Sequence, residues 1–284
     1  LRSIMKTNIL LFISVLCLSL ILYFEPGLEQ PEKQYLSSLN SQQIQHITIQ
    51  RKGLESIELD NTDQGWFISK PYQLAANPLR IGTITALAEK RSFSQFPAAG
   101  KLLKKYQLDD PLITVSLDDK KIAIGAEEPI NQHRYALLDD MIHLIDGTVY
   151  YQLRANLDTF ISLYLLPPGS EIQSIELPEH KISIEEGKWL LSPEDHGISA
   201  DSISTLLHSW KAAQALRIKI GSAPSSTDAE VISISLQDQT QIRYRVAGDA
   251  GNPELIRLPW NIVYQITPQL LEQLTRLTPP SISD

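Results

Sequence analysis

The longest apolar run of the chain begins at Ile9 and ends at Phe24, and it contains no charged side chain and only two serines. A helix rises about 1.5 Å per residue, so this run covers about 24 Å of an apolar layer that is about 30 Å thick. Basic Arg2 and Lys6 precede the run, whereas acidic residues follow it, which predicts that the preceding end stays in the cytoplasm. We therefore expect residues 1–25 to form a cytoplasmic stub and a transmembrane anchor in a bacterial inner membrane.

A cleaved signal peptide is the alternative interpretation of the same run, because its basic start and apolar centre are similar. Residues 25–29 read Glu-Pro-Gly-Leu-Glu, which lacks the Ala-x-Ala-like site that a signal peptidase needs. An uncleaved anchor is therefore favoured, and cleavage stays open. The region after the anchor is expected in the periplasm.

Residues 26–43 are polar and contain two prolines, which predicts a tether between the anchor and the folded part. Alternation of apolar and polar residues begins after it, where residues 44–49 read Ile-Gln-His-Ile-Thr-Ile. Residues 172–177 read Ile-Gln-Ser-Ile-Glu-Leu and show the same alternation. The period of two predicts a half-buried strand in each place.

The pattern then continues in the same order in both halves of the chain. Each opening strand is followed by a strand with a tryptophan that stops at a proline, by a capped helix and by two hairpins. The predicted caps are Asn77 before Pro78 in the first half and Ser199 in the second. One duplication, with the second copy about 120 residues after the first, explains the order. We therefore predict an α+β fold with two tandem modules, residues 44–166 and 167–284, each an antiparallel sheet with packed helices.

Several short motifs in this order carry a resemblance to a known family. They are the Trp66 strand that ends at Pro71, residues 105–111 (Lys-Tyr-Gln-Leu-Asp-Asp-Pro), Ile124 with Gly125, Arg134 with Tyr135, and the second tryptophan and helix unit. With this order the chain resembles the bacterial family DUF4340, a domain of unknown function, over nearly all of the chain past the tether. Gln107 stands where that pattern leads us to expect a glycine.

The resemblance implies an N-terminal anchoring helix and association with ABC-type export systems that carry gliding-motility-type auxiliary subunits. It brings no catalytic residue with it.

Charge and cysteine usage narrow the range of partners. The chain has 25 basic and 33 acidic side chains, which gives a formal net charge of −8. It therefore lacks the excess of positive charge with which proteins bind the phosphates of nucleic acids. Nucleic acid is therefore not expected as a partner. Cys17 is the one cysteine and lies in the apolar run, so an intramolecular disulfide or a thiolate metal site cannot form. No cofactor is expected.

Standard catalytic signatures are absent from the sequence. There is no Gly-x-Ser-x-Gly elbow, no phosphate-binding loop, no His-Glu-x-x-His motif and no dinucleotide fingerprint, so we expect no enzymatic activity. Asp-Asp pairs at 109–110, 118–119 and 139–140 could share a cation, but each falls at a predicted turn, where aspartate is favoured by its bonds to backbone amides. His133 and His143 bracket one hairpin and could begin a metal site, but a third ligand is not evident.

Two polar loops occupy equivalent places in the predicted modules, at residues 125–134 and 247–253. Equivalent loops of tandem modules tend to lie on corresponding faces, so these loops are candidate interaction surfaces. Ordinary polar connections are the alternative interpretation. The candidate interaction residues are Glu127, Glu128, Asn131, His133, Arg134, Asp249 and Asn252.

These features predict a single-pass inner-membrane protein whose periplasmic modules act as a non-enzymatic accessory or scaffold subunit of an envelope complex, with transporter or other envelope proteins as partners. One alternative is an envelope hydrolase with an Asp and His site between the modules. Another is a periplasmic module that binds a peptide, a saccharide or a lipid. The identity of the partner, the oligomeric state and any movement between the modules stay open.

Overall fold

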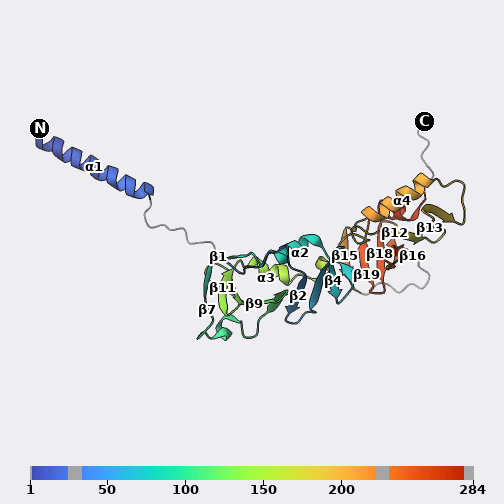
Figure 1. The fold of residues 1–284 in the computed structure, drawn as a ribbon, viewed down its shortest axis with the longest axis horizontal. Helices are drawn as coiled ribbons and strands as arrows, with labels where there is room; N and C mark the ends of the chain where they lie inside the picture. Colours follow the sequence, from blue (N-terminus) through green and yellow to red (C-terminus); the bar gives the residue numbers. More distant parts are fainter. Residues whose placement is uncertain (1, 25–33, 222–229, 278–284) are drawn as a thin grey trace. The chain divides into compact units, whose positions relative to one another are not determined.

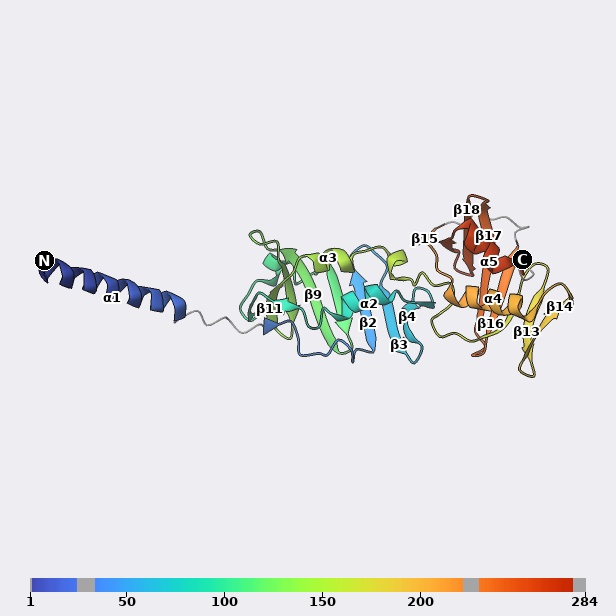
Figure 2. The ribbon, with the colours of Figure 1, turned by 90° about the horizontal axis from the view of Figure 1, so that it is seen from above.

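The computed structural model describes residues 2–24, 34–221 and 230–277 (Figures 1 and 2). Its contacts divide the chain into two units, Leu1–Gln34 and Tyr35–Asp284. Residues 1 and 25 of the predicted anchor segment, residues 26–33 of the predicted tether, and residues 222–229 and 278–284 of the predicted second module lie outside the described residues.

Helix α1 (Arg2–Phe24) contains the whole apolar run. The five consecutive side chains of residues 9–13 are each at least half exposed, and those of Leu10 and Phe12 are 70% exposed. An α-helix has 3.6 residues per turn, so five consecutive residues face every direction around its axis. Within the part of the chain that the structure describes, no helix is both long enough and apolar enough to cross a membrane.

The first half of Tyr35–Asp284 is built on a nine-stranded antiparallel sheet. Its strands in spatial order are β5 (Leu74–Ala75), β4 (Gly65–Lys70), β3 (Ile57–Thr62), β2 (His46–Arg51), β8 (Ile113–Leu117), β9 (Lys120–Glu127), β10 (Arg134–Leu138), β11 (Met141–Ile145) and β7 (Ser94–Pro97). Strands β1 (Gln34–Tyr35) and β6 (Arg91–Ser92) form a second, two-stranded sheet. Helices α2 (Pro78–Thr85) and α3 (Thr148–Leu153) lie on one face of the large sheet (Figure 2), and short 3-10 helices are present at η1 (Leu103–Tyr106) and η2 (Leu157–Phe160).

The second half contains an eight-stranded antiparallel sheet. Its strands in spatial order are β14 (Lys188–Ser192), β13 (Lys181–Glu185), β12 (Ile172–Glu176), β16 (Val231–Leu236), β17 (Gln241–Asp249), β18 (Asn252–Leu258), β19 (Ile262–Gln265) and β15 (Arg217–Ile220). Helices α4 (Ala200–Ala212) and α5 (Pro268–Thr275) lie on one face of this sheet (Figures 1 and 2).

The two large sheets share one order of connections. Each has three opening strands, then a four-stranded meander, and at the far edge the strand that precedes the meander in the sequence. The first helix follows the opening strands and the second follows the meander in both halves, and β5 is the one strand of the first sheet without a counterpart. The mixed content with large antiparallel sheets confirms the predicted α+β class. The duplication and the boundaries at residues 44 and 167 stay predictions.

The predicted helix caps are confirmed. Oδ1 of Asn77 accepts the N–H of Leu79 at 3.1 Å, and Oγ of Ser199 accepts the N–H of Ser202 at 3.1 Å. Each cap satisfies an amide that has no partner within the helix. Behind Ser199 one stripe of α4 is buried, and it consists of Ile203, Leu206, Leu207 and Trp210.

One continuous apolar core includes buried side chains of both large sheets. The segment between the sheets is hydrogen-bonded on both sides: the N–H of Ser162 donates to the carbonyl of Ala75 at 2.8 Å, and the N–H of Ala215 donates to the carbonyl of Leu163 at 2.8 Å. This explains why contacts join the two halves into one compact unit.

Residues 35–43, which belong to the predicted tether, are packed along the first half. Leu36 is buried and its N–H donates to the carbonyl of Lys90 at 2.8 Å. The Ser37 hydroxyl donates to the carbonyl of Ala88 at 2.7 Å. This part of the segment is therefore held by its backbone and by one buried leucine.

Candidate functional site

The first candidate loop is the connection between β9 and β10. The carboxylate of Glu128 is turned inward and accepts the N–H groups of Ile130 at 3.1 Å and Asn131 at 2.8 Å. The N–H of Glu128 donates to the carbonyl of His133 at 2.7 Å, which closes the loop. Glu128 therefore holds the shape of the loop.

Arg134 has a similar role at the start of β10. Its side chain is buried, and it donates from Nη1 to the carbonyl of Gly125 at 3.2 Å and from Nη2 to Oε2 of Glu127 at 3.1 Å. The guanidinium carbon lies 4.0 Å from the ring centre of Tyr150, within the range of a cation–π contact. Arg134 thus joins the hairpin to α3.

The remaining predicted residues of this loop border a hollow of about 460 Å³. Glu127, Asn131 and His133 line it together with Phe93, Asp146 and Tyr151, which no sequence motif indicates. The His133 ring stacks on Phe93 with centres 4.0 Å apart and planes 9° apart. Tyr151 is 67% exposed, and its ring meets that of Tyr150 edge-on with centres 5.3 Å apart.

Asp146 stands where the chain enters α3. Its Oδ1 accepts the hydroxyl of Thr148 at 2.7 Å and the N–H of Thr148 at 2.8 Å, and these hydrogen bonds lower the pKa of the Asp146 carboxyl. Lys90 approaches the same carboxylate at 3.5 Å. The lining of the hollow therefore includes a negative carboxylate that is partly balanced by a lysine.

The second candidate loop is the tight hairpin between β17 and β18. Pairing continues to Asp249 opposite Asn252, and Oδ1 of Asp249 accepts the N–H groups of Gly251 and Asn252, each at 2.9 Å. Both predicted residues therefore shape the turn. The loop lies between the strands that correspond to β9 and β10, as expected for equivalent loops, and none of the described cavities includes Asp249 or Asn252.

The structure does not bring the considered metal ligands together. His143 is buried in β11 with Nδ1 3.1 Å from Oγ of Ser92, and burial lowers the pKa of His143, whereas His133 lies on Phe93 in the loop. Asp118, Asp139 and Asp140 have positive φ angles of 51°, 46° and 63°, as expected for turn residues. Among the residues with described positions, no group of three or more His, Cys, Asp or Glu could hold a metal ion.

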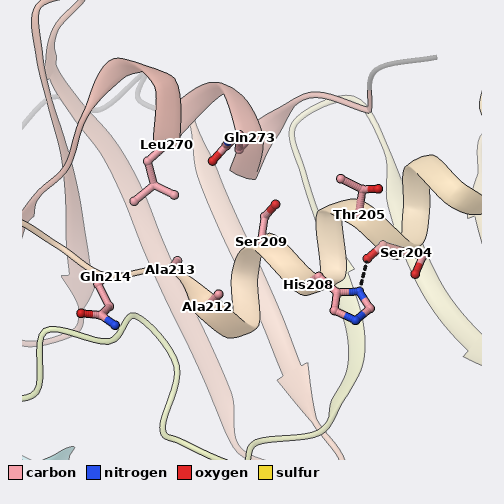
Figure 3. A pocket seen from close by; sticks show the side chains of 9 residues that line it. All are labelled: Ser204, Thr205, His208, Ser209, Ala212, Ala213, Gln214, Leu270 and Gln273. Carbon is pink, nitrogen blue, oxygen red and sulfur yellow. Dashed lines mark hydrogen bonds between the residues drawn. The ribbon is translucent and has the colours of Figure 1, made fainter. Parts of the chain in front are cut away.

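Each pair of helices also encloses a groove. The groove between α4 and α5 has a volume of about 610 Å³, and Figure 3 shows Leu270 and Gln273 of α5 above Ser209 of α4. His208 lines it, but Nδ1 of its ring is 2.8 Å from the carbonyl of Ser204 on the same helix. The corresponding groove between α2 and α3 has a volume of about 460 Å³. Both grooves are lined mostly by small and uncharged side chains, with His208 in the first and Lys90 in the second.

A small cavity of about 70 Å³ lies between the two halves. Phe67 and Leu74 line it from the first half, and Tyr244, Arg257 and Tyr264 line it from the second. None of the described residues around this cavity is an aspartate or a histidine. The hydrolase alternative, which needs such residues between the modules, therefore has no site in this cavity.

The comparison with known families agrees with the motif order found in the sequence. The chain matches the family described as Domain of unknown function (DUF4340) over residues 66–231, which is more than half of its 284 residues. The chain belongs to the DUF4340 family. No curated protein and no solved structure matches the chain.

The DUF4340 match begins at Trp66 in β4 and ends at Val231, the first residue of β16. It is shorter than the resemblance led us to expect, because residues 44–65 and the strands after Val231 lie outside it. It includes the whole first candidate loop and the helices α2, α3 and α4, but not the second loop. A domain of unknown function gives no activity, so a function for this DUF4340 protein has to be argued from its own residues.

Proposed function

We propose that this DUF4340 protein is a non-enzymatic accessory or scaffold subunit of a bacterial envelope complex. In this proposal residues 9–24 anchor the chain in the inner membrane, and Tyr35–Asp284 lies on the periplasmic side and binds neighbouring proteins. The resemblance noted in the sequence makes an ABC-type transporter the first candidate for such a neighbour.

The observation that carries the proposal is the apolar surface of α1. Its side chains from residue 9 to residue 13 are exposed in all directions around the axis. A helix that is apolar all round is stable only where apolar groups surround it, in a membrane or inside an assembly. The basic residues Arg2 and Lys6 before the run favour the orientation with the following region outside the cytoplasm.

The shared strand order of the two large sheets supports the tandem-module part of the proposal. Two unrelated sheets have no physical reason to place seven or more strands and two helices in the same order, whereas a duplication gives that order directly. Two modules offer corresponding loops and corresponding helix grooves, a common arrangement for surfaces that bind other proteins.

Topology and membrane attachment provide the test. We would express the full chain with a reporter enzyme at Asp284 that is active only in the periplasm, and wash the membranes with alkaline carbonate. The proposal expects an active reporter and a chain that resists extraction. In the matched control, Leu11→Lys and Leu16→Lys interrupt the apolar run and should release the chain. A silent reporter, or extraction of the unchanged chain, would contradict the anchor.

A second candidate function is binding of a polar ligand such as a saccharide in the hollow next to the first loop. The exposed ring of Tyr151 together with the polar side chains of Glu127, Asn131 and Asp146 favours it, because sugars stack on aromatic rings and bond to carboxylates and amides at their edges. Saturable binding of envelope saccharides that Tyr151→Ala abolishes, without any protein partner, would favour this function over the scaffold.

A further inference from the structure

A turn rich in lysine lies on the surface of the first half, shortly after its edge strand. Residues 101–106 read Lys-Leu-Leu-Lys-Lys-Tyr, and they follow β7, the outermost strand of the nine-stranded sheet. The last four of these residues form η1, and we call residues 101–106 the basic turn. Its three lysines, Lys101, Lys104 and Lys105, are all exposed. The basic turn therefore presents three positive charges to solvent.

The basic turn is held against the sheet by two of its apolar side chains. Leu103 and Tyr106 pack on a small apolar cluster that includes the buried Leu108. The ring centre of Tyr106 lies 4.7 Å from that of Tyr135. Leu102 is not part of this cluster, and its side chain is 72% exposed. The turn therefore keeps one leucine outside among its lysines, although an apolar cluster lies next to it.

The lysines of the basic turn are not paired with carboxylates. None of the ion pairs among the described residues involves them. Two exposed carboxylates stand nearby, because Asp109 follows the turn in the sequence and the carbonyl of Asp140 accepts the N–H of Ala98. Their neighbours Asp110 and Asp139 pair with lysines outside the turn. The turn is therefore a positive surface on a chain with a net charge of −8.

The basic turn belongs to the half that joins the predicted tether. Strand β1 pairs with β6, and β7 follows β6 after one residue, so β1 and β7 lie at the same end of the nine-stranded sheet (Figure 1). An extended chain covers at most about 3.6 Å per residue, so the stretch from residue 24 to residue 34 spans at most about 36 Å. From residue 91 to residue 97 the edge is at most about 20 Å long. The tether is therefore long enough for the basic turn to meet the bilayer that would hold α1.

The second half has no such turn in its sequence. The place between β15 and β16 corresponds to the stretch between β7 and β8, and its residues 221–230 read Gly-Ser-Ala-Pro-Ser-Ser-Thr-Asp-Ala-Glu. None of these residues is basic. A membrane contact explains the difference, because the tether keeps only the first half close to the bilayer.

We propose that the basic turn docks on the anionic lipid surface of the membrane that holds α1. Leu102 enters the boundary between headgroups and acyl chains, and the three lysines lie among the negatively charged headgroups. The inference rests on the anchor in the proposed function. It adds a second contact with the bilayer and assigns the edge of the first half that faces the lipid.

Fluorescence quenching in lipid nanodiscs tests this contact with the full chain. Cys17→Ser removes the native thiol, and a fluorophore is attached at Ala99→Cys, an exposed position that leaves Leu102 and the lysines unchanged. The nanodiscs contain phosphatidylcholine alone or mixed with phosphatidylglycerol, together with a lipid that carries a spin label near its headgroup. They hold no other protein, so quenching cannot come from a protein partner.

The label at Ala99→Cys should be quenched strongly in the mixed nanodiscs and weakly in phosphatidylcholine alone. High salt should reduce the quenching, because it screens exposed charges. The control label is Gln173→Cys, at an exposed position of β12 in the second half, and it should be quenched little in either lipid. Equal quenching at the two positions, or equal quenching of the Ala99→Cys label in the two lipids, would contradict the proposal.

Two matched pairs of substitutions test the lysines themselves. An anionic surface favours each nearby lysine about fivefold, so Lys104→Gln with Lys105→Gln should lower the ratio of docked to undocked chain about 25-fold. Lys181→Gln with Lys188→Gln removes the same charge from exposed positions of β13 and β14 and should leave the ratio unchanged. The same change in both pairs, or no change in the first pair, would overturn the proposal.

Elution of the chain with the nanodiscs separates this inference from the proposed function. A chain that does not elute with the nanodiscs would contradict the anchor, and the docking with it. A chain that elutes with them while its Ala99→Cys label stays unquenched would leave the anchor intact and refute the lipid contact alone.

Discussion

The indole Nε1 of Trp210 donates a hydrogen bond to the backbone carbonyl of Leu274 at 3.0 Å, and both residues are fully buried. Trp210 belongs to α4 and Leu274 to α5, so this bond links the two helices of the second half. The carbonyl of Leu274 lies near the end of α5, where helix carbonyls have no partner within the helix. The tryptophan thus satisfies a helix end and fixes the helix pair.

Replacing Trp210 with phenylalanine tests this relationship. Trp210→Phe removes the donor and leaves a buried carbonyl without a partner, which should lower the free energy of unfolding by about 1–3 kcal/mol. Urea unfolding of the full chain in detergent measures the change. Trp189→Phe, at a half-buried position on β14, is the control and should cost less. An equal loss of unfolding free energy in both variants would mean that the smaller ring, and not the missing hydrogen bond, accounts for the effect.

Gln107 adopts a left-handed backbone conformation with φ of 53° at the end of η1. A residue with a side chain is strained there, and glycine is not. We expect Gln107→Gly to raise the free energy of unfolding by about 1 kcal/mol after its own entropic cost is subtracted. Gln107→Ala keeps the Cβ atom, so it should not raise the free energy of unfolding in the same denaturation experiment. A rise in Gln107→Ala would show that relief of backbone strain is not the cause.

Gly125 lies in β9, where a Cβ atom would come within 2.9 Å of Cδ2 of Leu108 and would also clash with the carbonyl of Tyr106. Gly125→Ala should therefore destabilise the chain by about 1–3 kcal/mol. The companion variant is Gly82→Ala in the exposed interior of α2, where no atom lies within 4 Å of the added Cβ. Gly82→Ala should raise the free energy of unfolding by roughly 1 kcal/mol, because alanine has a higher helix propensity than glycine. Calorimetric unfolding of both variants should show shifts of opposite sign.

His143 gives the stability a pH dependence. Burial lowers the pKa of His143 below its ordinary value of 6.5, so the unfolded chain takes up a proton before the folded chain does. The contribution to stability is therefore complete above pH 6.5 and is lost as the pH falls toward the pKa in the folded protein, by about 1.4 kcal/mol per unit of difference.

Unfolding curves between pH 5 and pH 8 measure this effect. His143→Gln should reduce the loss of unfolding free energy at acid pH. His196 is 92% exposed, so His196→Gln should leave that loss unchanged. A decline that is the same in His143→Gln would assign the pH dependence to other groups.

The features that were predictable from the sequence are set by local rules. The alternation of apolar and polar residues indicated the opening strands of both halves. The caps at Asn77 and Ser199 follow from side-chain oxygens that reach amides two or three residues away. The α+β class follows from the succession of these elements.

The candidate site was less predictable, because burial and contacts depend on residues far apart in the chain. Glu128 and Arg134 look like exposed loop charges in the sequence, yet both are buried and support the hairpin. Phe93 and Tyr151 reach the hollow from separate segments and share no motif with the loop.

The central claim is that this DUF4340 protein works by binding other envelope proteins, and purification of the complex from native membranes tests it most directly. Full-length chain carrying an affinity tag at Asp284 would be extracted in mild detergent, and its partners quantified by mass spectrometry. The account predicts a membrane or periplasmic protein at a fixed molar ratio to the chain, lost in Asn131→Arg but kept in the exposed control Lys181→Ala. Recovery of the chain alone, in amounts independent of the Asn131 substitution, would contradict the scaffold function.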